Sequence, residues 1–186
     1  MGWLKANASI KTVNGEEIIV KNEIGEGGQG IVYKVLYKGK ERALKWYSKG
    51  VGDNSERFYE NLKRNIEKGS PASTFLWPLA LTEIKDKKYF GYVMELRPSC
   101  YKDFDLFLLN KVQFKNFSVI VNAALQIVAS FKKLHNLGFS YQDLNDGNFF
   151  INPENGDVLI CDNDNVAPDR QNLGIKGKPR YIAPEV

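Results

Sequence analysis

The first half of the chain alternates short β-rich runs with turn signals, which predicts a small antiparallel sheet. The Asn14-Gly15 dipeptide is a strong hairpin signal between the runs Ser9–Val13 and Glu17–Ile24. Further strand-like runs follow at Ile31–Tyr37, Arg42–Tyr47, Leu76–Thr82 and Tyr89–Leu96. Between the second and third of these, Asn54–Lys68 predicts a helix that ends at Gly69.

The second half of the chain is dominated by one long predicted helix that is closed by Gly138. A loop rich in Asp, Asn and Gly follows, then two short strands near Phe149–Ile151 and Asp157–Cys161, and the remainder is expected to be irregular. The pattern predicts a β-rich lobe over residues 1–96 and an α-rich lobe over residues 97–186, with a ligand cleft between them. The buried stripe of the long helix consists of Phe117, Ile120, Val121, Ala124, Ile127, Val128, Phe131 and Leu134.

Composition limits the classes of protein to which this chain can belong. With 186 residues and 43% hydrophobic side chains, it can bury one core or two small lobes. The net charge of +4 is mild and the basic residues are scattered, so a nucleic-acid partner is not expected. Cys100 and Cys161 lack metal-ligand spacing and are not needed as a disulfide, so we expect a reducing, cytoplasmic location.

The most apolar segment, residues 117–134, is interrupted by Asn122, Gln126, Lys132 and Lys133. We therefore expect that no window reaches the length of a membrane span and that the protein has no membrane partner.

A glycine-rich turn and a lysine form the first candidate for chemistry. Gly25-Glu26-Gly27-Gly28-Gln29-Gly30 fits the spacing Gly-x-Gly-x-x-Gly, in which backbone N–H groups can approach phosphate oxygens; an ordinary glycine-rich hairpin is the alternative. Strands on both sides favour a hairpin lid over a dinucleotide-binding fold. Fifteen residues later, Lys45 is either a solvent-exposed strand-edge lysine or a phosphate ligand held by a helix glutamate.

Asp143, Asn148 and Asp162 form the second candidate. The first two lie in the loop between the long helix and the next strand, and Asp162 follows an apolar strand. Stabilising a turn is the ordinary role of such residues in loops. Their oxygens nevertheless suit Mg²⁺, which Asp162 and Asn148 could bind, while Asp143 could orient an attacking hydroxyl and accept its proton.

Taken in order, these motifs resemble the eukaryotic-like (Hanks-type) protein kinases, and the resemblance extends from about Glu17 to Val186. It implies a bilobal α+β fold with an antiparallel sheet in the N-lobe and a partial helical C-lobe. It further implies ATP and Mg²⁺ as cofactors and transfer of the γ-phosphate to Ser or Thr of a protein substrate. The motifs are Gly25-x-Gly27-x-x-Gly30-x-Val32, Ala43-x-Lys45, Asp143-x-x-x-x-Asn148, Asp162 and Gly177-x-x-x-Tyr181-x-Ala183-Pro184-Glu185.

The resemblance also implies individual roles. Val32 and Ala43 would cover the adenine and Phe150 would form its floor. Lys45 would pair with a helix glutamate, either Glu60 or Glu56. We therefore expect catalytic roles for Asp143, Lys45, Asn148 and Lys178; metal binding by Asn148 and Asp162; nucleotide contacts from Gly25, Gly27, Gly30, Val32, Ala43, Lys45, Glu60 and Phe150; a gatekeeper at Met94; and a hinge formed by Glu95, Leu96 and Arg97.

Several positions depart from the family pattern. Tyr141-Gln142 replaces His-Arg before the catalytic Asp, and Gln142 carries no charge to bind a phosphorylated activation loop. The stretch 162–186 contains no Ser or Thr, so activation by phosphorylation there is not expected. Asn145 stands where the family has a lysine, and we expect Lys178 to supply the missing positive charge.

Asn163-Asp164 replaces the Phe-Gly that follows the metal-binding Asp. With Asn145, this leaves open a pseudokinase that acts as a nucleotide-binding scaffold. Other parts of the sequence, including Gly69-Ser70-Pro71, resemble a divergent bacterial branch of the family. That branch is often associated with phosphatase and von-Willebrand-type partners. The sequence stops directly after Ala-Pro-Glu, so we expect that the C-lobe is either truncated or completed by another chain.

Overall fold

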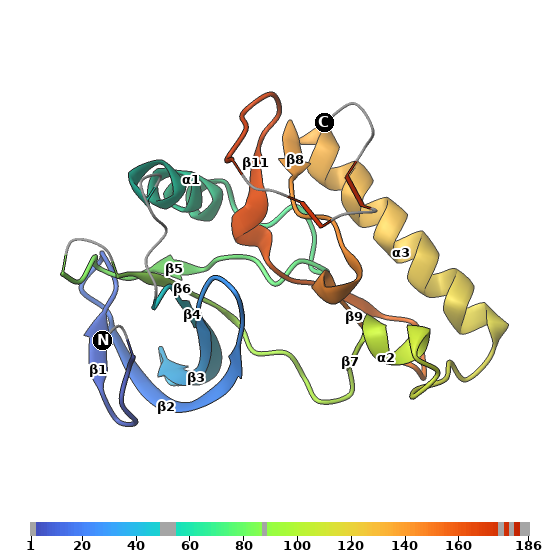
Figure 1. The fold of residues 1–186 in the computed structure, drawn as a ribbon, viewed down its shortest axis with the longest axis horizontal. Helices are drawn as coiled ribbons and strands as arrows, with labels where there is room; N and C mark the ends of the chain where they lie inside the picture. The colour runs from blue at the N-terminus through green and yellow to red at the C-terminus, as the bar shows by residue number, and fades with distance from the viewer. Residues whose placement is uncertain (1–2, 49–54, 87–88, 175–176, 179–180, 183–186) are drawn as a thin grey trace. The chain divides into compact units, whose positions relative to one another are not determined.

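The computed structural model describes residues 3–48, 55–86, 89–174, 177–178 and 181–182. The chain forms two compact units, one comprising Met1–Gly69 and Trp77–Leu96 and the other Ser70–Leu76 and Arg97–Val186 (Figure 1). The predicted lobes were continuous in sequence, whereas residues 70–76 lie in the second unit. The reason is a pair of hydrogen bonds with Ile160, whose N–H donates to Thr74 O over 2.7 Å and whose carbonyl accepts from Leu76 N over 2.8 Å.

The first unit is built on a six-stranded sheet with the order β1-β2-β3-β4-β6-β5, and each adjacent pair is antiparallel. The hairpin predicted at Asn14-Gly15 joins β1 to β2, and β3 has its predicted bounds. Of the run Leu76–Thr82 only β5 is a strand of the sheet, although Thr82 also bridges to Thr12, and Leu76 N donates instead to the carbonyl of Ile160. The strands are β1 (Ser9–Lys11), β2 (Glu17–Glu26), β3 (Ile31–Tyr37), β4 (Lys40–Trp46), β5 (Ala80–Leu81) and β6 (Gly91–Glu95).

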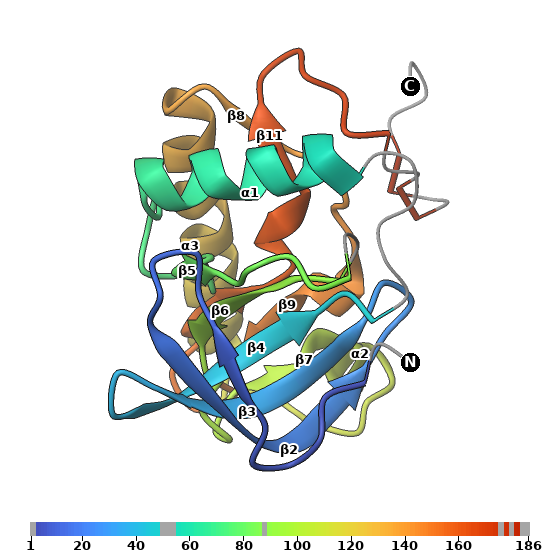
Figure 2. The same cartoon turned by 90° about the vertical axis from the view of Figure 1, so that its left-hand side faces the viewer.

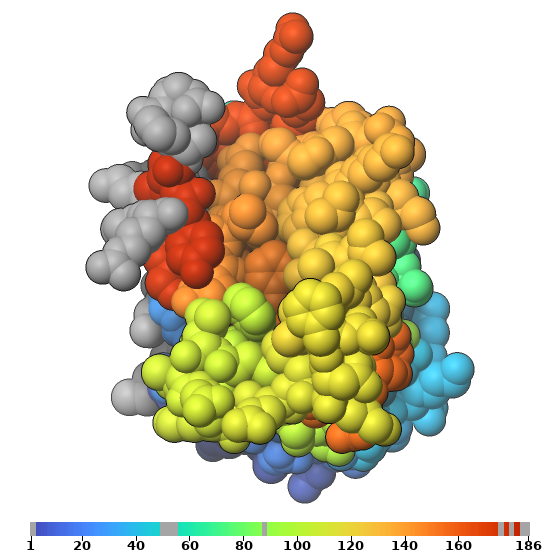
Figure 3. Space-filling view, turned by 90° about the vertical axis from the view of Figure 1, so that its right-hand side faces the viewer, coloured from blue at the N-terminus to red at the C-terminus, as the bar shows by residue number. Residues whose placement is uncertain are grey.

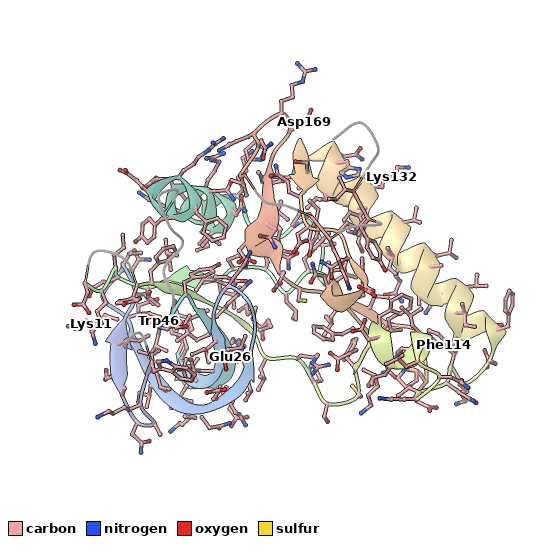
Figure 4. The ribbon with its side chains drawn as sticks, in the orientation of Figure 1. Lys11, Glu26, Trp46, Phe114, Lys132 and Asp169 are labelled. Atoms are coloured by element: carbon pink, nitrogen blue, oxygen red, sulfur yellow. The ribbon has the colours of Figure 1, made fainter. Side chains whose placement is uncertain are left out.

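Alternation along β3 separates the two faces of this sheet. Ile31, Tyr33, Val35 and Tyr37 are buried and the residues between them are half-buried, as a strand with one core-facing side requires. The strand is curled with its neighbours around this core, in which Trp46 is 2% exposed (Figures 2 and 4). The core cluster consists of Ile18, Val20, Ile31, Tyr33, Val35, Tyr37, Leu44, Trp46, Ala80 and Val93.

The predicted helix is α1 (Ser55–Lys68), which lies beside β5 and β6 (Figures 1 and 2). Its Phe58 ring packs edge-on against Tyr47, with 5.4 Å between ring centroids. The carbonyl of Asn65 accepts a hydrogen bond of 2.9 Å from the indole of Trp77. Gly69 then adopts φ 76°, so the helix ends where the sequence predicted.

The second unit contains the long helix α3 (Phe117–Asn136). Asn116 caps it by accepting a hydrogen bond of 3.1 Å from Val119 N, and Gly138 ends it at φ 73°. The tail expected to be irregular forms a strand, so that expectation was wrong. The remaining elements are β7 (Lys102–Asp103), α2 (Phe104–Leu108), β8 (Phe139–Tyr141), β9 (Phe149–Ile151), β10 (Val158–Ile160), β11 (Val166–Pro168) and the 3₁₀ turns η2 (Asp146–Asn148) and η3 (Asn163–Asn165).

By length and composition, α3 is the one helix in the described residues that could cross a membrane, with a mean hydropathy of 1.3 over 18 residues. The expectation that no window reaches this length was wrong, because the interrupting polar residues do not offset the Leu, Ile, Val and Ala content. The core helix of a globular protein passes the same test, and 22% of this window is buried. Here Gln126 ties α3 to the β10 region, donating to Asp157 Oδ1 at 3.2 Å and accepting from Val158 N at 3.3 Å. Figure 3 shows α3, in yellow, at the surface of the second unit. The predicted buried stripe was largely wrong, because the buried residues of α3 are Val119, Ala123, Ser130 and Leu134, and of the predicted stripe Phe117, Ile120, Val121, Ala124 and Val128 are exposed.

Candidate functional site

The glycine-rich turn joins β2 to β3 and is closed by a hydrogen bond of 2.8 Å from Gly27 N to Gly30 O. Gly30 is required by packing, because a Cβ there would lie 2.2 Å from the carbonyl oxygen of Trp46. Around Gly25 and Gly28 a Cβ would meet nothing within 4 Å. Gly30 is therefore needed for the close packing of the hairpin against β4, whereas Gly25 and Gly28 leave an open surface that a ligand could approach.

Lys45 lies on β4 and is only 6% exposed, so the solvent-exposed interpretation of this lysine was wrong. Its Nζ donates a hydrogen bond of 3.2 Å to the side-chain oxygen of Gln29, at the tip of the glycine turn. Glu56 and Glu60 are both exposed on α1. Pairing of Lys45 with one of these glutamates stays a prediction.

Strand register gathers the predicted nucleotide contacts of the first unit on one face of its sheet. Val32 lies opposite Lys45, and Ala43 lies opposite Met94. Residues directly opposite share a face, as do residues two apart on one strand, so these four side chains lie together, away from the core cluster.

The side chain of the predicted hinge residue Glu95 lies on the opposite face of the sheet. Glu95 follows Met94, so its side chain turns the other way, where the carboxylate pairs with Arg42 at 3.0 Å. The side chain of Glu95 is thus committed to the sheet, and only its backbone is left for the role that the resemblance implies.

In the second unit, the pairing of β9 with β10 assembles the candidate metal ligands. Phe149 lies opposite Ile160, and Cys161 N donates to the carbonyl of Asn148 over 3.0 Å. Asn148, just before β9, and Asp162, just after β10, therefore come to the same end of the hairpin. Asp162 adopts the left-handed conformation with φ 51° and ψ 39°, which costs about 1 kcal/mol for a residue with a Cβ.

The backbone carbonyl of Asp143 organises the loop around it. It accepts hydrogen bonds from the side-chain amides of Asn148 at 2.7 Å and Asn145 at 3.0 Å. Because the Asn148 nitrogen is used in this way, its amide oxygen is the atom that could bind a metal. The carboxylate Oδ2 of Asp143 lies 3.5 Å from the amide nitrogen of Asn165.

Among the described residues, no three His, Cys, Asp or Glu side chains cluster as a metal site would require. Asp162 and Asn148 supply two oxygen donors, which fits Mg²⁺ because this ion is commonly bound through one or two protein groups together with phosphate and water. The ligand chemistry is therefore compatible with Mg²⁺ delivered together with a nucleotide.

Tyr141 links β8 to the residue before Asp162. Its hydroxyl donates a hydrogen bond of 2.6 Å to the carbonyl of Cys161. Burial raises the pKa of Tyr141 well above its ordinary value, and the nearby negative charges of Cys161, Asp162, Asp164 and Asp143 raise it further. The phenol therefore stays protonated and remains a donor. The sequence shows tyrosine where the family has histidine, but it did not predict the hydrogen bond from Tyr141 to the Cys161 carbonyl.

The residue that replaces the family's phenylalanine is also held by a hydrogen bond. Asn163 is fully buried, and its amide nitrogen donates to the carbonyl of Ile160 over 2.8 Å. Asp164 is fully buried as well. At position 163 a polar contact thus stands where the family has an apolar side chain.

Arg97 and Phe150, a predicted hinge residue and the predicted adenine floor, lie together. The guanidinium carbon of Arg97 is 4.1 Å from the centre of the Phe150 ring. Arg97 also pairs with Asp103 at 3.3 Å, and Asp103 lies opposite Phe150 in the pairing of β7 with β9. The arginine thus covers one face of the ring.

Lys178 reaches the loop that carries Asp143, but its Nζ hydrogen-bonds to the carboxylate of Asp146. The hydrogen bond from Lys178 lowers the pKa of Asp146 and, reciprocally, raises the pKa of Lys178. The lysine is therefore a cation beside the loop. Its action on a phosphoryl group stays a prediction. Ala183, Pro184 and Glu185 lie outside the described residues.

Comparison with known proteins gives three findings on sequence. The model of the protein kinase domain family matches residues 18–186. A probable LIM domain-containing serine/threonine-protein kinase from Dictyostelium discoideum is 28% identical over 189 residues, which cover 95% of this chain and 27% of that protein. A probable serine/threonine-protein kinase of the same organism is 25% identical over 174 residues, covering 91% of this chain and 10% of that protein. The chain thus spans only a minor part of these relatives.

The fold resembles the structure of vaccinia related kinase 3, with a TM-score of 0.64 at 12% identity, over 88% of this chain and 52% of that chain. This likeness concerns the fold alone, and it confirms the predicted α+β kinase-like class. The two sequence relatives come from Dictyostelium, so assignment to a bacterial branch stays a prediction.

Replacing Gly30 by alanine should destabilise the first unit by about 2 kcal/mol, because the added Cβ would force the end of β4 to move. Gly28→Ala is the matched control, since its Cβ meets nothing within 4 Å. Urea unfolding followed by tryptophan fluorescence measures both variants. Equal midpoints for the two variants would contradict the packing role of Gly30.

Lys178→Ala should raise the pKa of Asp146 toward its ordinary value, because the main cause that lowers it is removed. A carboxyl-carbon NMR titration from neutral to acidic pH measures this pKa. Lys115→Ala, which removes the partner of Glu154 instead, should leave Asp146 unchanged. An Asp146 pKa that does not move in Lys178→Ala would show that the contact does not persist in solution.

Proposed function

Because the chain belongs to the protein kinase domain family, we propose that it binds ATP with Mg²⁺ and transfers the γ-phosphate to Ser or Thr of a protein substrate. The observation that carries the proposal is the assembly around the β9–β10 hairpin. The register brings Asn148 and Asp162 together, and a hydrogen bond of 2.7 Å from Asn148 to the Asp143 carbonyl adds the third group.

The first unit supplies the groups for the nucleotide. Val32, Ala43 and Met94 offer an apolar surface for the adenine on the face that also carries Lys45. Lys45 is buried and bonded to Gln29 of the glycine turn, so a phosphate would meet a cation that the protein already holds in place. The open space around Gly25 and Gly28 suits the approach of phosphate to backbone N–H groups.

The second unit supplies the groups for the transfer. Asp143 orients the substrate hydroxyl, whose oxygen forms the new bond to the γ-phosphorus while the bond to the leaving ADP oxygen breaks, and the carboxylate accepts the hydroxyl proton. Asp162 and Asn148 are the residues that would hold Mg²⁺, which when bound would offset the phosphate charge. Asn165, whose amide lies 3.5 Å from the Asp143 carboxylate, helps to fix the direction of that carboxylate.

A second candidate function is a nucleotide-binding scaffold without useful turnover. Asn145 stands where the family has a lysine, and its amide is committed to the loop: it donates to the Asp143 carbonyl at 3.0 Å and accepts from Gly147 N at 3.0 Å. The nearby cation, Lys178, is bonded to Asp146. Both observations leave less positive charge for the transferred phosphoryl group than the family pattern provides.

Asp143→Asn separates these two functions. Under the kinase proposal it should keep the affinity for Mg-ATP and lower phosphate transfer to a generic protein substrate by about a hundredfold or more, because the proton acceptor is lost. Isothermal titration measures binding, and radiolabelled transfer measures turnover. Glu154→Gln, which makes the same change of charge at an exposed site of the same unit, should leave both unchanged.

Mg-ATP binding without transfer in both wild type and Asp143→Asn would favour the scaffold. Absence of nucleotide binding in the wild type would overturn both functions. Lys45→Met serves as the binding control, because removal of the buried cation should weaken ATP affinity while the second unit stays unaltered.

Lys178→Ala should reduce the turnover number while the KM for ATP stays nearly unchanged, since the positive charge near the catalytic loop is lost. Asp146→Asn is the informative counterpart, because it removes the partner and keeps the lysine. Its turnover should equal or exceed that of the wild type. Unchanged turnover in Lys178→Ala would refute a catalytic role for this lysine.

A further inference from the structure

The chain after Asp162 folds back along the strand that precedes the catalytic loop. β11 pairs antiparallel with β8, and Asp169 N donates to the carbonyl of Gly138 over 2.8 Å. A turn follows, with a hydrogen bond of 3.0 Å from Gln171 N to Pro168 O. The segment 169–174, here called the return segment, thus lies against the residues that lead into Asp143.

Gln142, the residue immediately before Asp143, contacts this part of the chain at several points. Its amide nitrogen donates to the carbonyl of Gln171, and its amide oxygen accepts a hydrogen bond of 2.9 Å from Leu173 N. Its backbone N–H donates to the carbonyl of Asn165 over 3.0 Å. Its backbone carbonyl lies 3.8 Å from the position that a Cβ on Gly177 would occupy.

The chemistry of the side chain fits this arrangement closely. A primary amide carries a donor and an acceptor side by side, so it can bond a carbonyl and an N–H two residues apart on a neighbouring chain. Arginine has no acceptor and a carboxylate has no donor, so neither could make both bonds. The contact is sheltered, because Leu173 is only 7% exposed.

We propose that Gln142 is a positioning residue that holds the return segment against the catalytic loop without phosphorylation. The stretch from Asp162 to Val186 contains no Ser or Thr, so it offers Tyr181 alone as a hydroxyl for a phosphate. A neutral amide clamp needs no added charge. The consequence for activity rests on the proposed kinase function, in which the order of this segment would support turnover in the unmodified protein.

Gln142→Met removes both side-chain bonds and keeps a side chain of similar length. Hydrogen–deuterium exchange, read by NMR at the Leu173 amide without nucleotide, should become faster by roughly tenfold. The matched control is Gln126→Met, because the Gln126 amide also donates one bond, to Asp157, and accepts one, from Val158, and touches neither Gln171 nor Leu173 in these bonds. Exchange at Leu173 should stay at the wild-type rate in that control.

Exchange at Leu173 that equals the wild-type rate in Gln142→Met would overturn the proposal. Faster exchange to the same degree in both variants would also overturn it, because the effect would then be a general loss of stability. If Gln142→Met does not fold, Gln142→Arg provides the second test. It keeps a donor for Gln171 O and lacks an acceptor for Leu173 N, so exchange at Leu173 should still increase.

Turnover gives the functional readout. Gln142→Met should lower the turnover number severalfold with an unchanged KM for ATP, and phosphatase treatment of the wild type should change neither exchange nor turnover. Because the exchange measurement uses no nucleotide, it can support the clamp even if phosphate transfer is absent. A wild type that loses the protection of Leu173 on phosphatase treatment would overturn independence from phosphorylation.

Discussion

The antiparallel pairing of β9 with β10 is the constraint on which the candidate metal site depends. Every residue of β10 is buried, and along β9 Phe149 and Ile151 are more buried than Phe150 between them. A shift of the pairing by one residue would separate Asn148 from Cys161, whose N–H donates to the Asn148 carbonyl. The register is also held from the far side, because Ile160 exchanges two backbone hydrogen bonds with residues 74–76.

Neutral amides bond both the backbone carbonyl and the carboxylate of Asp143 in the catalytic loop. Asn145 and Asn148 satisfy its backbone carbonyl, and Asn165 approaches its carboxylate. A lysine at position 145 would add charge but would carry the cost of removing an ammonium group from water. The amides fix the geometry of the loop without adding a charge of their own. Asp162, which comes to the same end of the β9–β10 hairpin as Asn148, would hold a divalent cation there.

Local sequence patterns predicted the elements whose structure is decided locally. β3, β9 and the end of α1 at Gly69 follow from alternation and from a glycine at positive φ. The pattern failed where a distant segment decides the structure. β11 is three residues long and ends in proline, so nothing in its own sequence indicates that it pairs with β8. The same limit applies to residues 70–76, which belong to the second unit because of Ile160.

The candidate site shows the same difference between features that local sequence decides and features that a distant segment decides. Spacing singled out Asp143, Asn148 and Asp162 as candidates, because polar residues at chain reversals stand out from apolar strands, and their roles stay predictions. The packing role of Gly30 was not foreseen, since the requirement comes from the end of another strand. Gln142 was noticed only as a missing arginine, and a neutral side chain gives no signal of what it binds.

Four of the departures from the family around the catalytic loop share one physical property. A backbone group is bonded by a side chain that is neutral near neutral pH at Tyr141, Gln142, Asn145 and Asn163, and the raised pKa of Tyr141 keeps its phenol in that form. Hydrogen bonds between neutral groups need no counter-ion and respond little to salt. The geometry around Asp143 is therefore maintained largely by contacts that do not depend on charge.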